Sequence, residues 1–362
     1  MTYRSGFAAV LGRPNVGKST LVNRIVGTKV TITSPRPNTT RAQVRGVLNR
    51  PDSQAVFVDT PGLHRPRTAL GERLNDTATS SLDDVDVVVT MVDATGAIGP
   101  GDRMVLAHGA RRVRAQVRSA AMTAKFASAG GGSPGEDDCA PSDDDCSPEG
   151  DDQSSAEDCR SSREDDRSPG EDGEGVLLAP PALLVVVNKI DKVDDNGVLT
   201  HLASVAEVGE ALAVEGGAVP IPVEYFPVSA MTGEGVDTLV DAVLSRLPEG
   251  PRYYPEGMIT DVAEAFWVAD LVREQLLARV DDELPHSIAC RVTEWEWPRV
   301  RCEILVERDS QKGIVIGKGG ATLKAVGTAV RAQMPPGAYL ELFVRVEKRW
   351  QQRDDALDRL GF

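Results

Sequence analysis

Five short apolar runs in the first two thirds of the chain are each followed by a loop of glycine or polar residues. The run at 85–92 (VDVVVTMV) is almost continuously apolar, which is typical of a parallel strand buried on both faces. The pattern predicts a doubly wound, mostly parallel α/β sheet with strands at 7–11, 55–58, 85–92, 183–187 and 225–228. Ligands bind such a sheet at the carboxyl ends of its strands, where these loops lie.

The pattern changes after residue 250. Apolar residues first recur at three- and four-residue steps from Val262 to Val280, which predicts an amphipathic helix. Apolar and polar residues then alternate, which predicts half-buried strands at 288–292, 300–306 and 340–346. Two helical stretches, separated by the sequence GKGG, lie between the second and third of these strands. This part of the chain therefore predicts a smaller α+β domain.

The chain has 362 residues, whereas a single core seldom grows beyond roughly 250 residues, so we expect two domains. We place them at 1–250 and 258–362, with a linker at 251–257. The net charge is −15, but the segment 130–175 holds 17 acidic and 3 basic residues, and the rest of the chain is nearly neutral. Its composition predicts a disordered, solvated insertion, with a specific binding tail as the alternative. The negative net charge of the whole chain therefore does not exclude a nucleic-acid partner.

The five cysteines show no CxxC pair, so we expect reduced thiols and no zinc cluster. Cys290 and Cys302 fall on inward positions of predicted strands and are expected to be core residues. The chain contains no run of 18 apolar residues, and its N-terminus does not resemble a secretory signal. We expect a cytoplasmic protein, and a peripheral contact with the inner face of the cell membrane stays open.

The loop after the first strand reads GRPNVGKST and matches the P-loop pattern GxxxxGK[ST]. Its glycines let backbone N–H groups point at phosphate oxygens, while Lys18 reaches the β and γ phosphates and the Ser19 hydroxyl ligates Mg²⁺. A glycine-rich turn is the alternative. The predicted nucleotide-binding residues of this loop are Gly12, Arg13, Pro14, Asn15, Val16, Gly17, Lys18, Ser19 and Thr20.

Three further loops at strand ends extend this site. In DTPG, Asp59 can hold magnesium through water, and the Gly62 N–H can contact a γ phosphate. In NKID, the Asp191 carboxylate can accept hydrogen bonds from N1–H and the 2-amino group of guanine, which adenine cannot offer. These loops predict GTP rather than ATP and add to the nucleotide site Asp59, Thr60, Pro61, Gly62, Asn188, Lys189, Asp191, Ser229 and Ala230.

The sequence GKGG fits the GxxG loop of a KH module, whose backbone approaches single-stranded RNA closely enough to clamp about four nucleotides. The following helix N-terminus adds partial positive charge near a phosphate. A helix-breaking turn is one alternative, and a KH-like domain that only packs against protein partners is another. The predicted RNA-binding residues are Lys312, Ile314, Ile316, Gly317, Lys318, Gly319, Gly320 and Lys324.

Taken in order, GRPNVGKS, DTPG, NKID and SA, followed by the GKGG-containing domain, resemble the Era-type proteins, bacterial Ras-like GTPases of ribosome assembly. The resemblance covers nearly the whole chain except the acidic insertion. It implies a P-loop GTPase domain followed by a type II KH domain. It also implies GTP hydrolysis, with Thr40 of ITSPRPNTTR joining Ser19 and Asp59 as magnesium ligands. The catalytic residues would be Lys18, Thr40 and Gly62.

The resemblance further implies a monomer that binds GTP or GDP and the 3′ end of small-subunit ribosomal RNA, and that assists assembly of the 30S subunit. Leu63 stands where Ras-like enzymes place a water-orienting glutamine, so we expect slow intrinsic turnover. Relatives with such a replacement can use potassium, which makes Asn15 a candidate potassium-site residue. The alternative function is an RNA-binding assembly scaffold whose nucleotide site is mainly structural.

Overall fold

The computed structural model describes residues 2–34, 36, 39–63, 68–82, 84–129, 179–214, 220–280 and 287–361, with the side chains of 123–129 left out. The acidic insertion predicted at 130–175, with Cys139, Cys146 and Cys159, lies outside the described residues. The two domains described below belong to one compact unit, Met1–Ala120 with Leu178–Phe362.

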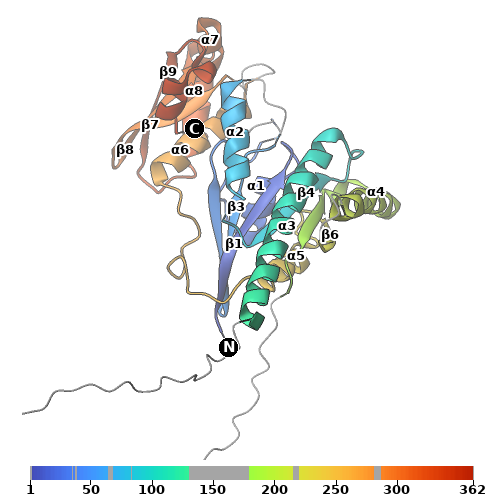
Figure 1. Cartoon of the computed structure of the whole chain (residues 1–362). Helices are drawn as coiled ribbons and strands as arrows, with labels where there is room; N and C mark the ends of the chain where they lie inside the picture. Colours follow the sequence, from blue (N-terminus) through green and yellow to red (C-terminus); the bar gives the residue numbers. More distant parts are fainter. Residues whose placement is uncertain are drawn as a thin grey trace, which may run out of the picture. The chain divides into compact units, whose positions relative to one another are not determined.

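A six-stranded sheet, with strand order β2-β3-β1-β4-β5-β6, forms the N-terminal domain (Figure 1). All neighbouring strands are parallel except β2, which pairs antiparallel with β3. The five predicted strands and the mostly parallel sheet are confirmed, whereas β2 was not predicted. The strands are β1 (Arg4–Gly12), β2 (Val44–Asn49), β3 (Ser53–Asp59), β4 (Val87–Asp93), β5 (Leu183–Asn188) and β6 (Val223–Val228).

Helices cover both faces of this sheet. On one face, α1 (Lys18–Val26) and α5 (Val236–Leu244) pack on the strands, and on the other lie α2 (Ala69–Ser80), α3 (Pro100–Ala129) and α4 (Asp195–Val214). Every residue of β5 is buried, which explains why all of its residues except the terminal Asn188 are apolar. Burial of each such valine or leucine contributes about 1.5–3 kcal/mol. The helices packed on both faces therefore hold the strands in place, and with them the edge of the sheet from which the glycine-rich and polar loops emerge.

Helix α4 is long and apolar enough, by composition, to cross a membrane. It also packs on the sheet, because Val205 is fully buried and Val208 nearly so in the core beneath β5. A core helix and a signal sequence pass the same composition test, and 22% of the apolar window of α4 is buried.

The C-terminal domain is a three-stranded sheet in the order β7-β8-β9, with α6, α7 and α8 packed on one face and η4 and α9 packed against Ala289 and Leu305 on the other. β7 is antiparallel to β8, and β9 is parallel to it, so the sheet is mixed, as expected for the predicted type II KH domain. Cys302 is fully buried and Cys290 half-buried against its core, which confirms them as core residues. The elements are α6 (Glu264–Leu277), β7 (Ala289–Glu296), β8 (Arg299–Val306), α7 (Asp309–Ile316), η3 (Lys318–Gly320), α8 (Ala321–Arg331), β9 (Tyr339–Val346), η4 (Trp350–Gln352) and α9 (Asp354–Arg359).

The segment between the domains is fixed to the first sheet by one buried glutamine. The side-chain carbonyl of Gln54 accepts hydrogen bonds from the backbone N–H groups of Tyr253 and Tyr254 at 2.9 and 3.0 Å. Its amide donates to the carbonyl of Tyr254 at 3.0 Å. The chain thus passes the start of β3 and then lies beside the edge strand β2, where the Val47 N–H donates to the carbonyl of Ile259 at 2.9 Å. Phe7 of β1 packs against the Tyr253 ring.

Candidate nucleotide and RNA sites

The predicted P-loop lies between the end of β1 at Gly12 and the start of α1 at Lys18. Gly17 caps this helix with φ = +105°, a conformation that L side chains rarely adopt. A Cβ atom at Gly17 would lie 2.2 Å from Nδ2 of Asn188, so the position also lacks room for a side chain. The N-terminus of α1, where backbone N–H groups have no helical partner, therefore opens onto the loop, as phosphate binding requires.

Lys18 is buried, and its Nζ donates hydrogen bonds to the carbonyl oxygens of Gly12 and Arg13, both at 3.1 Å. The ammonium group is thus held across the loop that would surround the phosphates. Burial lowers the pKa of Lys18 to about 8, and the nearby Asp59 carboxylate only partly opposes this shift. A bound phosphate would restore the favourable surroundings of the charged form.

Three predicted magnesium ligands lie together. The Ser19 hydroxyl donates to Oδ2 of Asp59 at 2.7 Å, and the Thr40 hydroxyl lies 2.9 Å from Ser19 Oγ and 3.3 Å from the same carboxylate oxygen. Burial raises the pKa of Asp59, against the opposing effects of Lys18 and these hydroxyl groups. The other oxygen, Oδ1, is buried without a hydrogen-bond partner among the described residues. Such a set of oxygen donors around an unsatisfied carboxylate oxygen fits Mg²⁺.

Sequence reasoning missed one member of this cluster, Thr31. Its hydroxyl, which is buried, donates to Oδ2 of Asp59 at 2.9 Å. The amide of Asn23 fixes the backbone here, since its Oδ1 accepts from the N–H groups of Val30 and Thr31. Only the fold brings Thr31 to the end of β3, and no local motif marks it.

The predicted guanine-recognition loops are joined through Asn188. Its Nδ2 donates to the carbonyl of Val16 at 2.7 Å, and its Oδ1 accepts from the N–H of Ala230 at 2.9 Å. The P-loop and the two base-contacting loops are thus held by one buried side chain. Asp191 accepts a hydrogen bond from the Ser229 hydroxyl at 2.6 Å, which fixes the carboxylate expected to bind guanine.

Lys189 has a left-handed backbone (φ = +70°), and its Nζ pairs with Oδ2 of Asp93 at 2.5 Å. Burial alone would raise the pKa of Asp93, but hydrogen bonds from Lys189 and Thr95 outweigh it and lower the pKa. Asp93 was also missed, although its place at the end of β4 was a visible signal. The ion pair holds the Lys189 stem beside the predicted base site.

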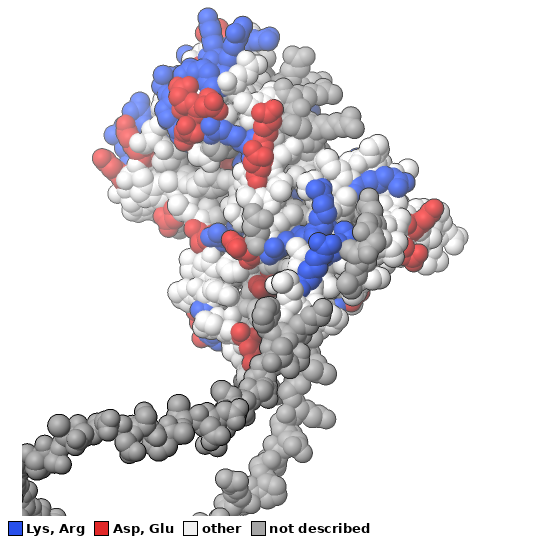
Figure 2. Space-filling view, in the orientation of Figure 1, with Lys and Arg blue, Asp and Glu red and all other residues white. Residues whose placement is uncertain are grey.

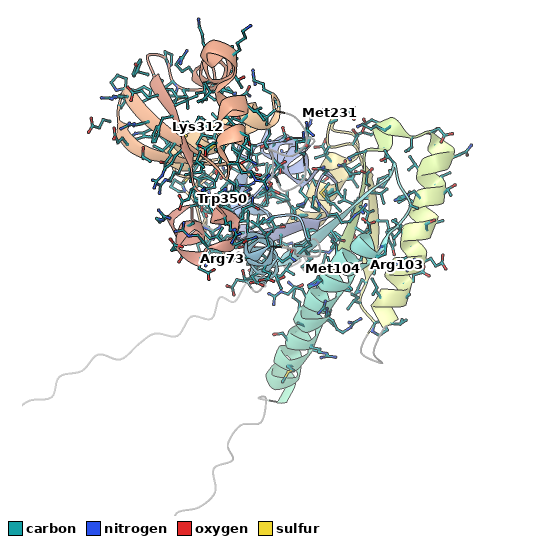
Figure 3. The ribbon with its side chains drawn as sticks, turned by 90° about the horizontal axis from the view of Figure 1, so that it is seen from above. Arg73, Arg103, Met104, Met231, Lys312 and Trp350 are labelled. Carbon is teal, nitrogen blue, oxygen red and sulfur yellow. The ribbon has the colours of Figure 1, made fainter. Side chains whose placement is uncertain are left out.

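A cavity of about 700 Å³ connects these groups. Lys18, Ser19, Thr40 and Gly62 line its phosphate end, and Lys189 and Met231 line the other end. Met231, labelled in Figure 3, is 67% exposed at the rim. The cavity lies at the carboxyl edge of the sheet, where the sequence placed the nucleotide.

The residues after Asp59 lie against the P-loop. A Cβ atom at Gly62 would lie 2.6 Å from the backbone nitrogen of Pro14, so only glycine fits there. The Leu63 N–H donates to the carbonyl of Gly12 at 3.2 Å, and its side chain is buried in the core. Leu63 therefore points away from the position where water would attack a γ phosphate.

The GKGG sequence links α7 and α8, as predicted. Gly317, Gly319 and Gly320 all have positive φ, at 73°, 60° and 79°. A Cβ atom at Gly317 would lie 2.3 Å from the hydroxyl oxygen of Thr322, whereas one at Gly319 or Gly320 would meet nothing within 4 Å. The last two glycines therefore present open backbone, as close approach of an RNA strand requires.

The side chains predicted to contact RNA are exposed or half-buried. Lys318 and Lys324 are exposed, Ile314 is 52% exposed, and Ile316 and Lys312 are half-buried. Val315 between the isoleucines packs inward, which turns Ile314 to the surface. Figure 2 shows Lys and Arg side chains gathered over the end of the domain that carries α7, and Figure 3 labels Lys312 there.

The comparisons with known proteins agree with this arrangement. Residues 7–121 match the family described as 50S ribosome-binding GTPase, and residues 283–351 match the KH domain. The chain is 40% identical over 373 residues to GTPase Era of Mycobacterium avium (strain 104) and 41% identical over 372 residues to GTPase Era of Mycobacterium tuberculosis (strain ATCC 25618 / H37Rv). Each alignment covers 99% of both chains.

Two solved structures are similar over 99% of both chains, each with a TM-score of 0.71 and 30% identity. One is Era in complex with MgGDPNP and nucleotides 1506–1542 of 16S ribosomal RNA, and the other is a single-residue variant of Aquifex aeolicus Era bound to GDP·AlF4⁻. The fold, the two sites and the full-length similarity lead to one conclusion: the chain belongs to the Era family of GTPases.

Proposed function

We propose that this GTPase is a switch that binds the 3′ end of small-subunit ribosomal RNA and assists assembly of the 30S subunit. The observation that carries the proposal is the presence, in one chain, of the GTP cavity and an open GxxG backbone. Support comes from the 99% mutual coverage with an Era structure that holds a GTP analogue and 16S ribosomal RNA.

In the proposed site, the Ser19 and Thr40 hydroxyls and, through water, the Asp59 carboxylate would hold Mg²⁺, which would supply positive charge at the phosphate oxygens. Lys18 and the Gly62 N–H contact the γ phosphate as water attacks it in line. Leu63 is buried, so it does not align this water. The protein therefore contributes positioning and charge, and slow intrinsic turnover follows.

Base choice in this proposal rests on Asp191, which accepts from guanine, and on the Ala230 N–H, which donates to Asn188 in this structure and would turn to O6 when guanine binds. Asn188, whose amide already bonds both neighbouring loops, keeps them in register. Lys189 covers the base with its stem, as its ion pair with Asp93 supports.

The remaining assignments extend the proposal. The domains are 1–250 and 258–362 with a linker at 251–257, and the protein acts as a cytoplasmic monomer with a peripheral contact to the cell membrane. Potassium binds near Asn15, whose positive φ of 66° shapes the P-loop.

In the switch, GTP and Mg²⁺ order the segments around Thr40 and after Gly62, and hydrolysis releases them.

The test is GTP turnover by the purified full chain, with and without small ribosomal subunits, in potassium and then in sodium buffer. Stimulation by subunits that is lost in Asp191→Ala is the expected result. Subunit binding without turnover in any buffer would instead establish the RNA-binding scaffold. Equal rates in potassium and sodium would remove potassium from the proposal while leaving the rest.

RNA binding is tested with the double variant Lys318→Asp, Gly319→Asp. Gly319 has open space around it, and aspartate tolerates a left-handed backbone, so the variant is expected to fold. Affinity for a single-stranded 3′-end RNA is expected to fall about tenfold or more, because the clamp gains negative charge. A matched control is Arg111→Asp, Ala115→Asp on the exposed side of α3, which changes the charge equally. An equal loss in both variants would show only a general charge effect.

A further inference from the structure

Helix α6 of the C-terminal domain contacts two described stretches of the chain between α1 and β2. At one end, the Glu274 carboxylate accepts hydrogen bonds from Lys29 Nζ and, at 3.0 Å, from the Thr33 N–H. At the other end, the Arg273 guanidinium donates to the carbonyl oxygen of Thr39. Two adjacent residues of one helix thus contact this segment on its Thr33 side and at Thr39, directly before Thr40.

A second contact follows directly after Thr40. The Arg41 guanidinium donates to the carbonyl of Ile288 at 2.8 Å and lies 5.6 Å from the centre of the Trp350 ring. Trp350 is itself fully buried, and its indole N–H donates to the carbonyl of Ser287 at 3.0 Å. The C-terminal domain therefore holds the residues on both sides of Thr40.

The charged side chains that form these contacts are buried, so water screens their charges little. Arg41, Arg273 and Glu274 are 5%, 4% and 8% exposed. Hydrogen bonds from buried ionised groups are stronger and more directional than exposed ion pairs. Arg273 is also fixed on α6 by Asp270, whose Oδ1 accepts from it at 3.2 Å. The donor to Thr39 is thus pre-positioned by its own helix.

We infer that the C-terminal domain positions Thr40 for GTP hydrolysis, with Arg273 and Arg41 as its positioning residues. The inference rests on the proposed role of Thr40 as a magnesium ligand. The Thr40 hydroxyl lies 2.9 Å from Ser19 Oγ, and the residues on each side of Thr40 bear the contacts just described. A displacement of α6 therefore moves this hydroxyl, even though α6 lies outside the GTPase fold.

The test compares Arg273→Ala and Arg273→Lys with the control Arg279→Ala, in the full chain. Arg279 lies just after α6, is exposed and bonds to Gln275. Three quantities are measured: the Mg²⁺ concentration at half-maximal GTP turnover, the affinity for a non-hydrolysable GTP analogue, and the affinity for GDP. Thermal unfolding of each variant shows whether it is folded.

Arg273→Ala is expected to raise the half-saturating Mg²⁺ concentration about tenfold and to weaken analogue binding similarly, because a charged hydrogen bond is lost. GDP affinity is expected to change less than about twofold, since the Thr40 segment is ordered by the γ phosphate. Arg273→Lys, which keeps a charged donor, restores part of the loss, and Arg279→Ala matches the wild type.

Arg41→Ala provides a second variant, because Arg273→Ala also removes a partner of Asp270 and so perturbs α6 itself. Arg41 also interacts electrostatically with Arg273 and Asp270, so thermal unfolding is measured for this variant too. Arg41→Ala breaks the contact after Thr40 while the Arg273–Asp270 pair stays. Unchanged Mg²⁺ dependence in folded variants would overturn the inference, as would a parallel loss of GDP affinity. If the wild type itself hydrolyses no GTP, the proposed function fails instead, which is a separate outcome.

Discussion

Asn188 donates a hydrogen bond from its side-chain amide to the backbone carbonyl of Val16 at 2.7 Å, across 172 positions of sequence. The same amide accepts from the Ala230 N–H, so Asn188→Ala leaves two buried polar groups unsatisfied. We expect GDP and GTP affinities to fall about 10- to 100-fold, by calorimetric titration. Asn188→Asp is the informative companion, because it keeps the acceptor and loses the donor. Affinity within threefold of the wild type in Asn188→Ala would contradict the prediction.

Lys18 predicts a pH dependence of nucleotide binding. Burial lowers its pKa from 10.5 to about 8, so the ammonium group of the free protein loses its proton on either side of that pH and is half deprotonated at it. A bound phosphate favours the charged form and raises the pKa again, so binding takes up a proton above about pH 8. GDP affinity is therefore expected to be nearly constant up to about pH 7 and to fall as the pH rises through 8 to about 9.

The measurement is a series of GDP titrations over this range. Lys18→Arg is the control, because the guanidinium keeps its charge and should remove the slope, whatever it does to absolute affinity. A wild-type affinity that stays flat to pH 9 would show that Lys18 remains charged in the free protein.

Substitution of Leu63 by alanine is expected to lower the stability of the protein while it leaves GTP turnover nearly unchanged. Its side chain is buried in the core beneath the sheet, so Leu63→Ala is expected to lower the free energy of unfolding by about 2–4 kcal/mol. GTP turnover below the unfolding temperature is expected to change less than about threefold. Leu63→Gln provides the sharper test, since a tenfold faster turnover in that variant would mean that position 63 reaches the attacking water.

The glycines of GKGG are expected to tolerate alanine unequally. At Gly317, φ = 73° and ψ = 169° combine with a Cβ position 2.3 Å from the Thr322 hydroxyl oxygen, so Gly317→Ala should cost about 2–4 kcal/mol. Gly319→Ala meets no neighbour and should cost about 1 kcal/mol. Denaturant unfolding followed by tryptophan fluorescence measures both, since all four tryptophans follow residue 258. Equal costs would contradict the difference in surroundings.

The elements that sequence predicted well are those whose function depends on consecutive residues. The P-loop needs glycines, Lys18 and Ser19 at fixed spacing, and strand β1 before them is apolar throughout its inner part. The same holds for the GKGG turn between two helices. In both cases the loop chemistry and the flanking periodicity identify the same element, so the prediction has two independent supports.

Strand β2 lacked such support. Its burial does not alternate, since Gly46 and Val47 are both buried in succession. Gly46 lies close under α1, where a Cβ atom would be 2.8 Å from a Val26 methyl group. The strand is fixed by pairing with β3 and by this packing, which are tertiary contacts. Thr31 and Arg273 were missed for the same reason, because each contacts its partner only in the folded chain.

The pairing of β4 with β5 has a further consequence for the chain's tolerance of added length. The Thr90 hydroxyl donates to the carbonyl of Leu184 across 94 positions, so this contact closes a long loop. Loop-closure entropy grows only logarithmically, and each doubling of length costs about 0.6 kcal/mol. Removing 130–175 would roughly halve the loop and so change the free energy of closure by about that amount. The chain enters β5 at Leu183, the end opposite Asn188. The length of chain inserted before that strand therefore does not alter the geometry of the nucleotide loops.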